Sequence, residues 1–168
     1  MRWYKMKKTV YYLKVNIERE WLDYPEGFDW NKLQKGEDIG YFDYKILNHL
    51  KNAKKGDIVV LHSVKEERGK SQNPNVVGFG IISQERKYDK DRFVTRVMKV
   101  KDLAAPIPIR DLKKDNVLTN AEPFKKGSNR CPVTKLSDSE YQHLKEILVK
   151  LNVIHQNDFD ELEKIEVI

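Results

Sequence analysis

The sequence predicts an α+β fold, a small twisted and mostly antiparallel β-barrel flanked by helices. Residues 58–63 and 76–83 are short runs rich in β-branched residues, each bounded by turn-forming residues, as is typical of strands. Gly78 and Gly80 interrupt the second run and allow it to bend. Residues 137–140 read Ser-Asp-Ser-Glu, a capping box that predicts the start of a helix. Together these patterns favour a barrel that holds a ligand at its rim.

The first third of the chain is expected to contain a strand, an aromatic loop region and a helix. Residues 9–17, TVYYLKVNI, have the composition and partial alternation of a strand. Residues 18–42 place six aromatic side chains among Gly, Pro and Asp, which predicts irregular structure with a helical turn near residues 31–34. The side chain of Asp43 can accept from the first backbone amides of a helix, so we expect a helix from Asp43 to about Ala53.

The connector between the two central strands, residues 64–75, is long, polar and basic, and we interpret it as a solvated loop. It contains Gly-Lys-Ser at residues 69–71, which resembles the end of a phosphate-binding P-loop. A P-loop requires a glycine five positions earlier, where Val64 stands, and residues 72–75 cannot open the helix that must follow. The sequence therefore predicts no nucleotide hydrolysis from this segment.

The last part of the chain is expected to add one strand, an extended crossing and one helix. Residues 92–100 have strand composition, and the prolines of residues 106–109 favour extended backbone. Five apolar residues with helical spacing follow the capping box: Tyr141, Leu144, Ile147, Leu148 and Leu151. Residues 157–168 alternate acidic with apolar residues, which fits a short helix, a strand or a linker.

The 168-residue length indicates a single domain, residues 9–155, with a basic lead-in of residues 1–8 and an acidic segment or linker, residues 156–168. No apolar run approaches the roughly 18 residues that a membrane-spanning helix requires. No secretory signal is recognisable, so we expect a cytoplasmic protein with no membrane partner. The single cysteine, Cys131, allows no internal disulfide and suits a reducing compartment.

The charge of the chain favours a polyanionic partner. The net charge is +6, and residues 158–168 contribute −4 of it, so residues 1–157 carry +10. An excess of this size is typical of proteins that bind nucleic acid. A lysine-rich surface without any such partner has the same composition.

The residues that could perform catalysis do not form a recognisable motif. The four histidines include no HExxH pair and no His/Cys cluster, so we expect no metal site and no cofactor. A hydrolase that uses Cys131 and His62, or a nuclease that uses carboxylates, stays as an alternative. Carboxylate pairs such as Glu66 and Glu67 lie in polar sequence and are interpreted as solvated charges. We expect no enzymatic activity from this chain.

The aromatic residues of the loop region are stronger candidates for a binding site. Trp21, Trp30, Tyr41 and Phe42 occur in loop-rich sequence, where several rings can form a cage for an unpaired base. The alternative is that they fill the ends of the barrel as core. We expect Trp30 and Tyr41 to line a pocket, and Trp21 or Phe42, or both, to be core.

The order of these motifs resembles that of the EVE domain, a PUA-like fold, and more loosely the YTH domain. The matching segments are TVYYLKVNIEREW, GYFDY, KKGDIVVLHS, NVVGFGIISQE, PIPIRDLKKDNVL and FKKGSNRCPVTKLSDSEYQHL, which together cover residues 9–151. The resemblance implies a non-catalytic PUA-like barrel that accepts a modified or flipped base of a nucleic acid in an aromatic pocket. Flipping a base costs a few kcal/mol, which stacking and hydrogen bonds to the base edge must offset.

The resemblance also implies which residues form the site. The base pocket would consist of Val15, Asn16, Trp21, Trp30, Tyr41, Phe42, His62, Ser63 and Asn129. The phosphate contacts would come from Lys65, Arg68, Lys70, Lys125, Lys126, Ser128 and Arg130. EVE domains usually carry tryptophan two residues before the glycine that matches Gly40, whereas this chain has Asp38, so Trp30 or Tyr41 would have to replace that ring.

Similar domains form the amino-terminal targeting module of McrB-type restriction motors. The resemblance therefore implies a module that reads a modified base in DNA and continues into a nucleotide-hydrolysing domain, and we expect the isolated domain to be a monomer. A free-standing PUA-like RNA-binding protein without modification specificity is the main alternative.

Overall fold

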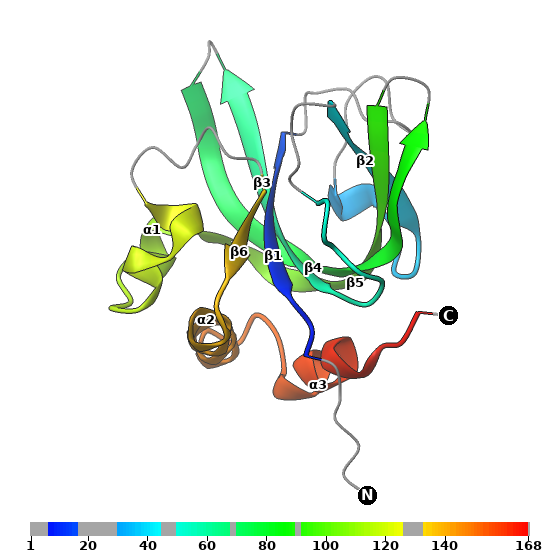
Figure 1. Cartoon of the computed structure of the whole chain (residues 1–168). Helices are drawn as coiled ribbons and strands as arrows, with labels where there is room; N and C mark the ends of the chain where they lie inside the picture. Colours follow the sequence, from blue (N-terminus) through cyan, green and yellow to red (C-terminus); the bar gives the residue numbers. More distant parts are fainter. Residues whose placement is uncertain are drawn as a thin grey trace, which may run out of the picture.

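A computed structural model describes residues 7–16, 30–44, 50–67, 70–89, 92–125 and 133–167. These residues form a strongly twisted six-stranded sheet with helices packed against it (Figure 1). The strands are β1 (Val10–Asn16), β2 (Asp38–Tyr44), β3 (Ile58–Glu67), β4 (Lys70–Asp89), β5 (Arg92–Pro108) and β6 (Val133–Leu136). Their order in the sheet is β2-β5-β4-β3-β1-β6. Only the β1–β3 pair is parallel among these strands, so the predicted α+β, mostly antiparallel architecture is confirmed.

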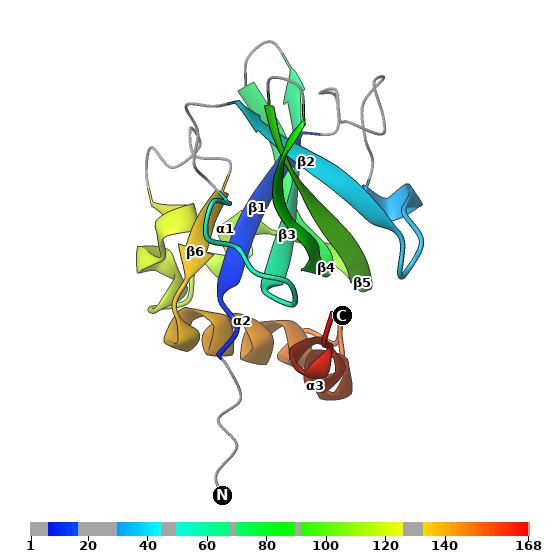
Figure 2. The ribbon, with the colours of Figure 1, turned by 45° about the vertical axis from the view of Figure 1, so that its right-hand side comes forward.

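The described helical segments are short except at the carboxyl end of the chain. They are η1 (Trp30–Lys32), α1 (Ile109–Leu112), η2 (Leu118–Asn120), η3 (Glu122–Phe124), α2 (Asp138–Lys150) and α3 (Gln156–Lys164). Figure 2 shows α2 and α3 together across one end of the sheet, whereas α1 lies beside β6. No helix among the described residues is long and apolar enough to cross a membrane.

The sheet separates two hydrophobic clusters. The inner core contains Ile39 of β2 and Val133 of β6, which are the two edge strands, so the sheet curves around this cluster. The helix-side core lies on the opposite face and includes Tyr12, Phe79 and Leu144, together with residues of all three α-helices. Neighbouring residues of a strand point to opposite faces, which places Tyr11 in the inner core and Tyr12 in the helix-side core.

The elements with strong local signals are confirmed. The predicted first strand is β1, and the predicted carboxyl-terminal helix is α2. The Ser137 hydroxyl accepts from the Glu140 amide at 3.2 Å, and the Glu140 carboxylate accepts from the Ser137 amide at 2.8 Å. This reciprocal pair satisfies amides that the first turn of a helix otherwise leaves unpaired.

The prediction of a solvated loop at residues 64–75 was wrong. Instead β3 and β4 continue as a hairpin in which Lys65 pairs with Gln72 and Glu67 pairs with Lys70. A register shift between Ser63 and Lys65 accommodates the segment around Pro74, which cannot donate a ladder hydrogen bond.

Two further expectations need correction. Asp43 does not cap a helix, because Asp43 and Tyr44 pair with β5 as the end of β2, and the described residues 50–52 form a turn. Residues 45–49 of the expected helix lie outside the described residues. The extended crossing of residues 106–109 is the end of β5, but its last residue, Ile109, already begins α1.

The acidic segment forms a helix that packs on the domain, one of the alternatives left open for it. Phe159 and Leu162 of α3 are buried in the helix-side core, and the Phe159 ring meets Phe79 edge to face with ring centres 5.1 Å apart. Lys8 Nζ donates to the Ile165 carbonyl at 2.6 Å and so satisfies an acceptor just beyond the last turn of α3.

Candidate functional site

Trp30 lies on the inner face of the sheet, where two glycines make room for its ring. Its side chain is 1% exposed in the inner core. A Cβ atom added at Gly78 would lie 2.9 Å from Trp30 Nε1, and one at Gly80 would lie 3.3 Å from the far edge of the ring. The indole therefore packs directly against the backbone of β4. This position makes Trp30 a core residue, and its predicted role as a stacking surface stays a prediction.

A buried lysine fixes the turn that carries Trp30. Lys99 of β5 is 2% exposed, and its ammonium donates to the carbonyls of Trp30 at 3.0 Å and Leu33 at 2.7 Å. It also forms an ion pair with Asp102 at 2.6 Å and lies 5.4 Å from the centre of the Trp30 ring. A buried charge requires such partners, so Lys99 connects η1 to the sheet.

Tyr41 is the second predicted pocket ring whose side chain the structure describes. It lies in β2, pairs with Thr95 and is half-buried against the inner core that contains Trp30. The structure thus brings Trp30 and Tyr41 to the same face of the sheet. Tyr41 keeps part of its surface exposed, whereas Trp30 does not. The backbone of Phe42 follows in β2, and its side chain lies outside the description.

The structure separates His62 from Ser63. The prediction that they end a strand together was wrong, because β3 continues to Glu67 and the two residues point to opposite faces. His62 is 3% exposed on the helix side, where its Nδ1 shares a 2.7 Å hydrogen bond with the Tyr12 hydroxyl. Ser63 follows Leu61, an inner-core residue, by two positions and is half-buried on the inner face.

The His62 imidazole is neutral at physiological pH. Burial lowers its pKa to about 3, with smaller contributions from the positive charges of Lys14 and Lys113. The Tyr12 ring also meets the His62 ring and the Phe124 ring edge to face, each with centres 5.4 Å apart. His62 is thus part of the packing beneath α1 and η3, and it does not face the side of the sheet that holds Trp30 and Tyr41.

The remaining pocket candidates are only partly described. Val15 pairs with Ser63 and Asn16 with Val64, so the backbone at the end of β1 lies beside that of β3. The side chains of Val15 and Asn16 are outside the description, and Trp21 and Asn129 lie outside the described residues altogether, as does Cys131. Their predicted roles stay predictions.

Some of the predicted phosphate contacts lie among the described residues and others lie outside them. Lys65 and Lys70 belong to the two strands of the β3–β4 hairpin. Lys125 is exposed directly after η3. Arg68, Lys126, Ser128 and Arg130 lie outside the described residues. No group of His, Cys, Asp and Glu in the described part of the chain could hold a metal ion.

Asp38, where EVE domains usually have tryptophan, does not face the inner core. Its carboxylate accepts from Arg96 at 3.0 Å and from the Ser83 hydroxyl at 3.4 Å. Ile39 and Tyr41 are inner-face residues, so strand alternation places Asp38 on the other face. The carboxylate therefore forms a partly exposed ion pair across β2, β5 and β4.

Sequence reasoning missed the buried Lys99 beneath η1 and its ion pair with the partly exposed Asp102. Lysines in a basic sequence are normally read as surface charges, and the carbonyl partners of Lys99 come from residues more than 60 positions away. The spacing of Gly78 and Gly80 was the available signal, because glycines at i and i+2 leave one face of a strand open to a large ring.

The fold is shared with several solved structures at low sequence identity. A hypothetical protein from Leishmania major superposes with a TM-score of 0.64 and 15% identity, over 87% of this chain and 98% of that chain. A protein from Pseudomonas syringae superposes with a TM-score of 0.65 and 14% identity, over 83% of this chain and 99% of that chain. Human THYN1, solved in complex with DNA containing 5-methylcytosine, superposes with a TM-score of 0.60 and 16% identity, over 84% of this chain and 98% of that chain.

These superpositions show a common PUA-like architecture, and at such low identities they show nothing finer. No curated protein matches this chain. A family model gives the sequence-level assignment, because the model of the EVE domain matches residues 19–147, most of the chain. The chain belongs to the EVE-domain family.

Proposed function

We propose that this chain is a non-catalytic module that binds nucleic acid and reads a modified or flipped base in DNA. The observation that carries the proposal is the EVE family match over residues 19–147. The likeness to human THYN1, solved with 5-methylcytosine DNA, supports DNA as the partner. The basic character of the chain, with a net charge of +6, agrees with a polyanionic partner.

Tyr41 is the ring to which we assign stacking on the base. It packs against the inner core and is half-buried, so Tyr41 is held by packing and keeps part of its surface exposed. Trp30, at 1% exposure, belongs to the inner core against which Tyr41 packs. Ser63, half-buried on the same face, would supply a hydroxyl to the base edge. Stacking of this kind contributes about 1–3 kcal/mol per base.

The test is the affinity of the protein for matched duplexes that carry cytosine, 5-methylcytosine or N6-methyladenine, measured by fluorescence anisotropy at one salt concentration. We expect tighter binding to one modified duplex. Tyr41→Ala should weaken that binding, and Tyr41→Phe, which keeps the ring, should retain most of it. Equal affinity for the three duplexes would contradict modified-base reading, and strong competition by single-stranded RNA would favour an RNA-binding protein instead.

We further propose that the module targets a McrB-type motor, so that nucleotide hydrolysis comes from another domain. Lys70 and Ser71 of the apparent phosphate-binding motif lie in strand β4, not at the start of a helix, so this segment offers no site for a nucleotide. The sequence of the complete reading frame tests the proposal. A motor domain in the same frame would support it, and a frame limited to the EVE domain would contradict it.

A further inference from the structure

A group of lysines surrounds the buried Tyr12–His62 pair on the helix-side face. Lys14 is the register partner of His62 in the β1–β3 ladder and lies two residues after Tyr12, so it points to the same face. Lys113 directly follows Leu112, which is fully buried in the same cluster as Tyr12. Lys125 directly follows Phe124, whose ring meets the Tyr12 ring.

Three separate elements therefore bring positive charge to one place. Lys14 comes from β1, Lys113 from the end of α1, and Lys125 from the end of η3. The charges of Lys14 and Lys113 both reach the His62 imidazole, where they help burial to lower its pKa. Lys113 and Lys125 are exposed. The neutral histidine beneath them neither adds to nor cancels their charge.

Two of the nearby carboxylates have partners, and Glu122 of η3 is exposed. Asp111 lies 3.6 Å from Lys114, and Asp115 lies 3.2 Å from His143. Lys113 and Lys125 form no ion pair with any residue in the described part of the chain. Lys113 and Lys125 therefore present positive charges that no described carboxylate pairs with.

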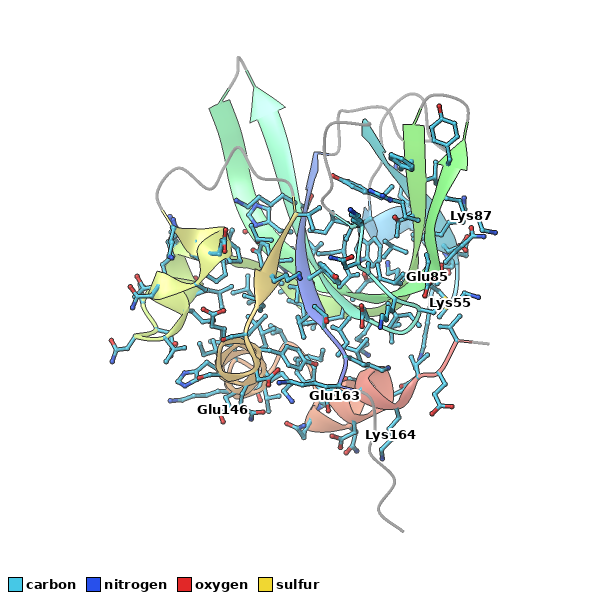
Figure 3. All side chains as sticks on the ribbon, viewed as in Figure 1. Lys55, Glu85, Lys87, Glu146, Glu163 and Lys164 are labelled. Carbon is cyan, nitrogen blue, oxygen red and sulfur yellow. The ribbon has the colours of Figure 1, made fainter. Side chains whose placement is uncertain are left out.

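The carboxyl-terminal segment that contains α2 and α3 is acidic. Residues 138–167 contain eight acidic residues against Lys145, Lys150 and Lys164, a net charge of −5, so the rest of the chain carries +11. Figure 3 shows Glu146 on α2 and Glu163 on α3, together beneath the sheet. A polyanion is repelled by this acidic segment and attracted to the basic remainder of the chain.

We propose that Lys14, Lys113 and Lys125 form a binding surface for the nucleic-acid phosphate backbone, on the opposite face of the sheet from the ring that reads the base. The inference rests on the proposed function and deepens it. A nucleic-acid strand whose base reaches the inner face would continue past the carboxyl-terminal ends of β1 and β3 to this surface. Contacts to phosphates hold the strand in register and carry no sequence information, so this surface would contribute affinity without discrimination.

The test is the salt dependence of binding to a 5-methylcytosine duplex for a triple variant, Lys14→Gln, Lys113→Gln and Lys125→Gln. Each phosphate contact adds about 0.9 to the slope of log affinity against log salt for duplex DNA, so we expect the slope to fall by about 2 to 3. The ratio of affinities for modified and plain duplexes should not change. The double variant Lys113→Gln, Lys125→Gln alters exposed residues only and should lower the slope by about 1 to 2.

The matched control changes three exposed lysines that do not belong to this surface: Lys54→Gln, Lys55→Gln and Lys164→Gln. These residues line an open groove of about 820 Å³. This control removes the same net charge and should leave the slope nearly unchanged. Equal slopes for the triple variant and the control would overturn the inference while leaving the proposed function standing. Failure of the unmodified protein to bind any duplex would overturn both.

Discussion

The two faces of the sheet are built by different means. Three α-helices close the helix-side face, and their side chains form a continuous apolar core from Tyr12 to Leu162. The inner face has a smaller apolar core, in which Trp30 packs against two glycines and the carbonyls of the 3-10 turn η1 satisfy a buried lysine. The first face depends on regular hydrophobic packing, which stabilises the fold. The second combines a smaller apolar core with these specific contacts.

The largest expected effect is on the helix-side face. Phe159→Ala removes a fully buried ring that contacts Phe79 and Tyr141, so the free energy of unfolding should fall by about 3–5 kcal/mol. Urea denaturation measures the loss. Leu151→Ala, at a side chain that is 48% exposed, is the control and should change stability little. An equally small loss for Phe159→Ala would show that α3 does not belong to the domain core.

The corresponding change on the inner face is Lys99→Met. It removes the ammonium and leaves the Asp102 carboxylate and two carbonyls without their donor. Breaking a buried pair from one side costs about 3–5 kcal/mol, but Asp102 is partly exposed, so we expect about 3 kcal/mol in the same denaturation experiment. Lys101→Met, at a half-exposed neighbour on β5, serves as the control. Stability equal to that of the control would contradict the role of Lys99 in fixing η1.

The pH dependence of stability tests the burial of the His62 imidazole on the helix-side face. The unfolded imidazole has a pKa near its ordinary value of 6.5, whereas burial lowers the folded pKa to about 3. The unfolded state therefore binds the proton first, and stability falls as the pH drops from about 6.5 toward 3. The loss is roughly 1.4 kcal/mol per pH unit. His62→Gln should flatten this part of the profile, and an unchanged profile would contradict the burial of a neutral imidazole.

The smallest effect is expected at the start of α2. Ser137→Ala removes the hydroxyl that accepts from the Glu140 amide and should cost about 1 kcal/mol. Ser139→Ala changes an exposed serine in the first turn and tests whether the loss is specific to the cap. A similar loss for both variants would argue against the capping box as its cause.

The helix-side elements could be predicted because their signals are local. The capping box at Ser137 and the apolar stripe that begins at Tyr141 lie within one helix, so the sequence contains the whole pattern. Asp43 has an equally local capping signal, but pairing with Phe93 of β5 overrides it. In the β3–β4 hairpin, polar residues carry no hydrophobic alternation, and only cross-strand pairing reveals the strands.

The inner face could be predicted only in part. Trp30 and Tyr41 were recognised as a pair because aromatic residues are informative in loop-rich sequence, and the structure does bring them into one cluster. Their unequal exposure depends on Gly78 and Gly80, which lie far from both in sequence. The face that His62 occupies follows from its position in an extended β3, and the sequence predicted that strand to end at Ser63.

The central claim is that the inner face reads the base through Tyr41. The most direct test is the ratio of dissociation constants for plain and modified duplexes, measured for the unmodified protein and for Tyr41→Ala at the same salt concentration. We predict that the ratio falls by about tenfold in the variant, since stacking on one base contributes about 1–3 kcal/mol. An unchanged ratio in a folded Tyr41→Ala variant would contradict the account.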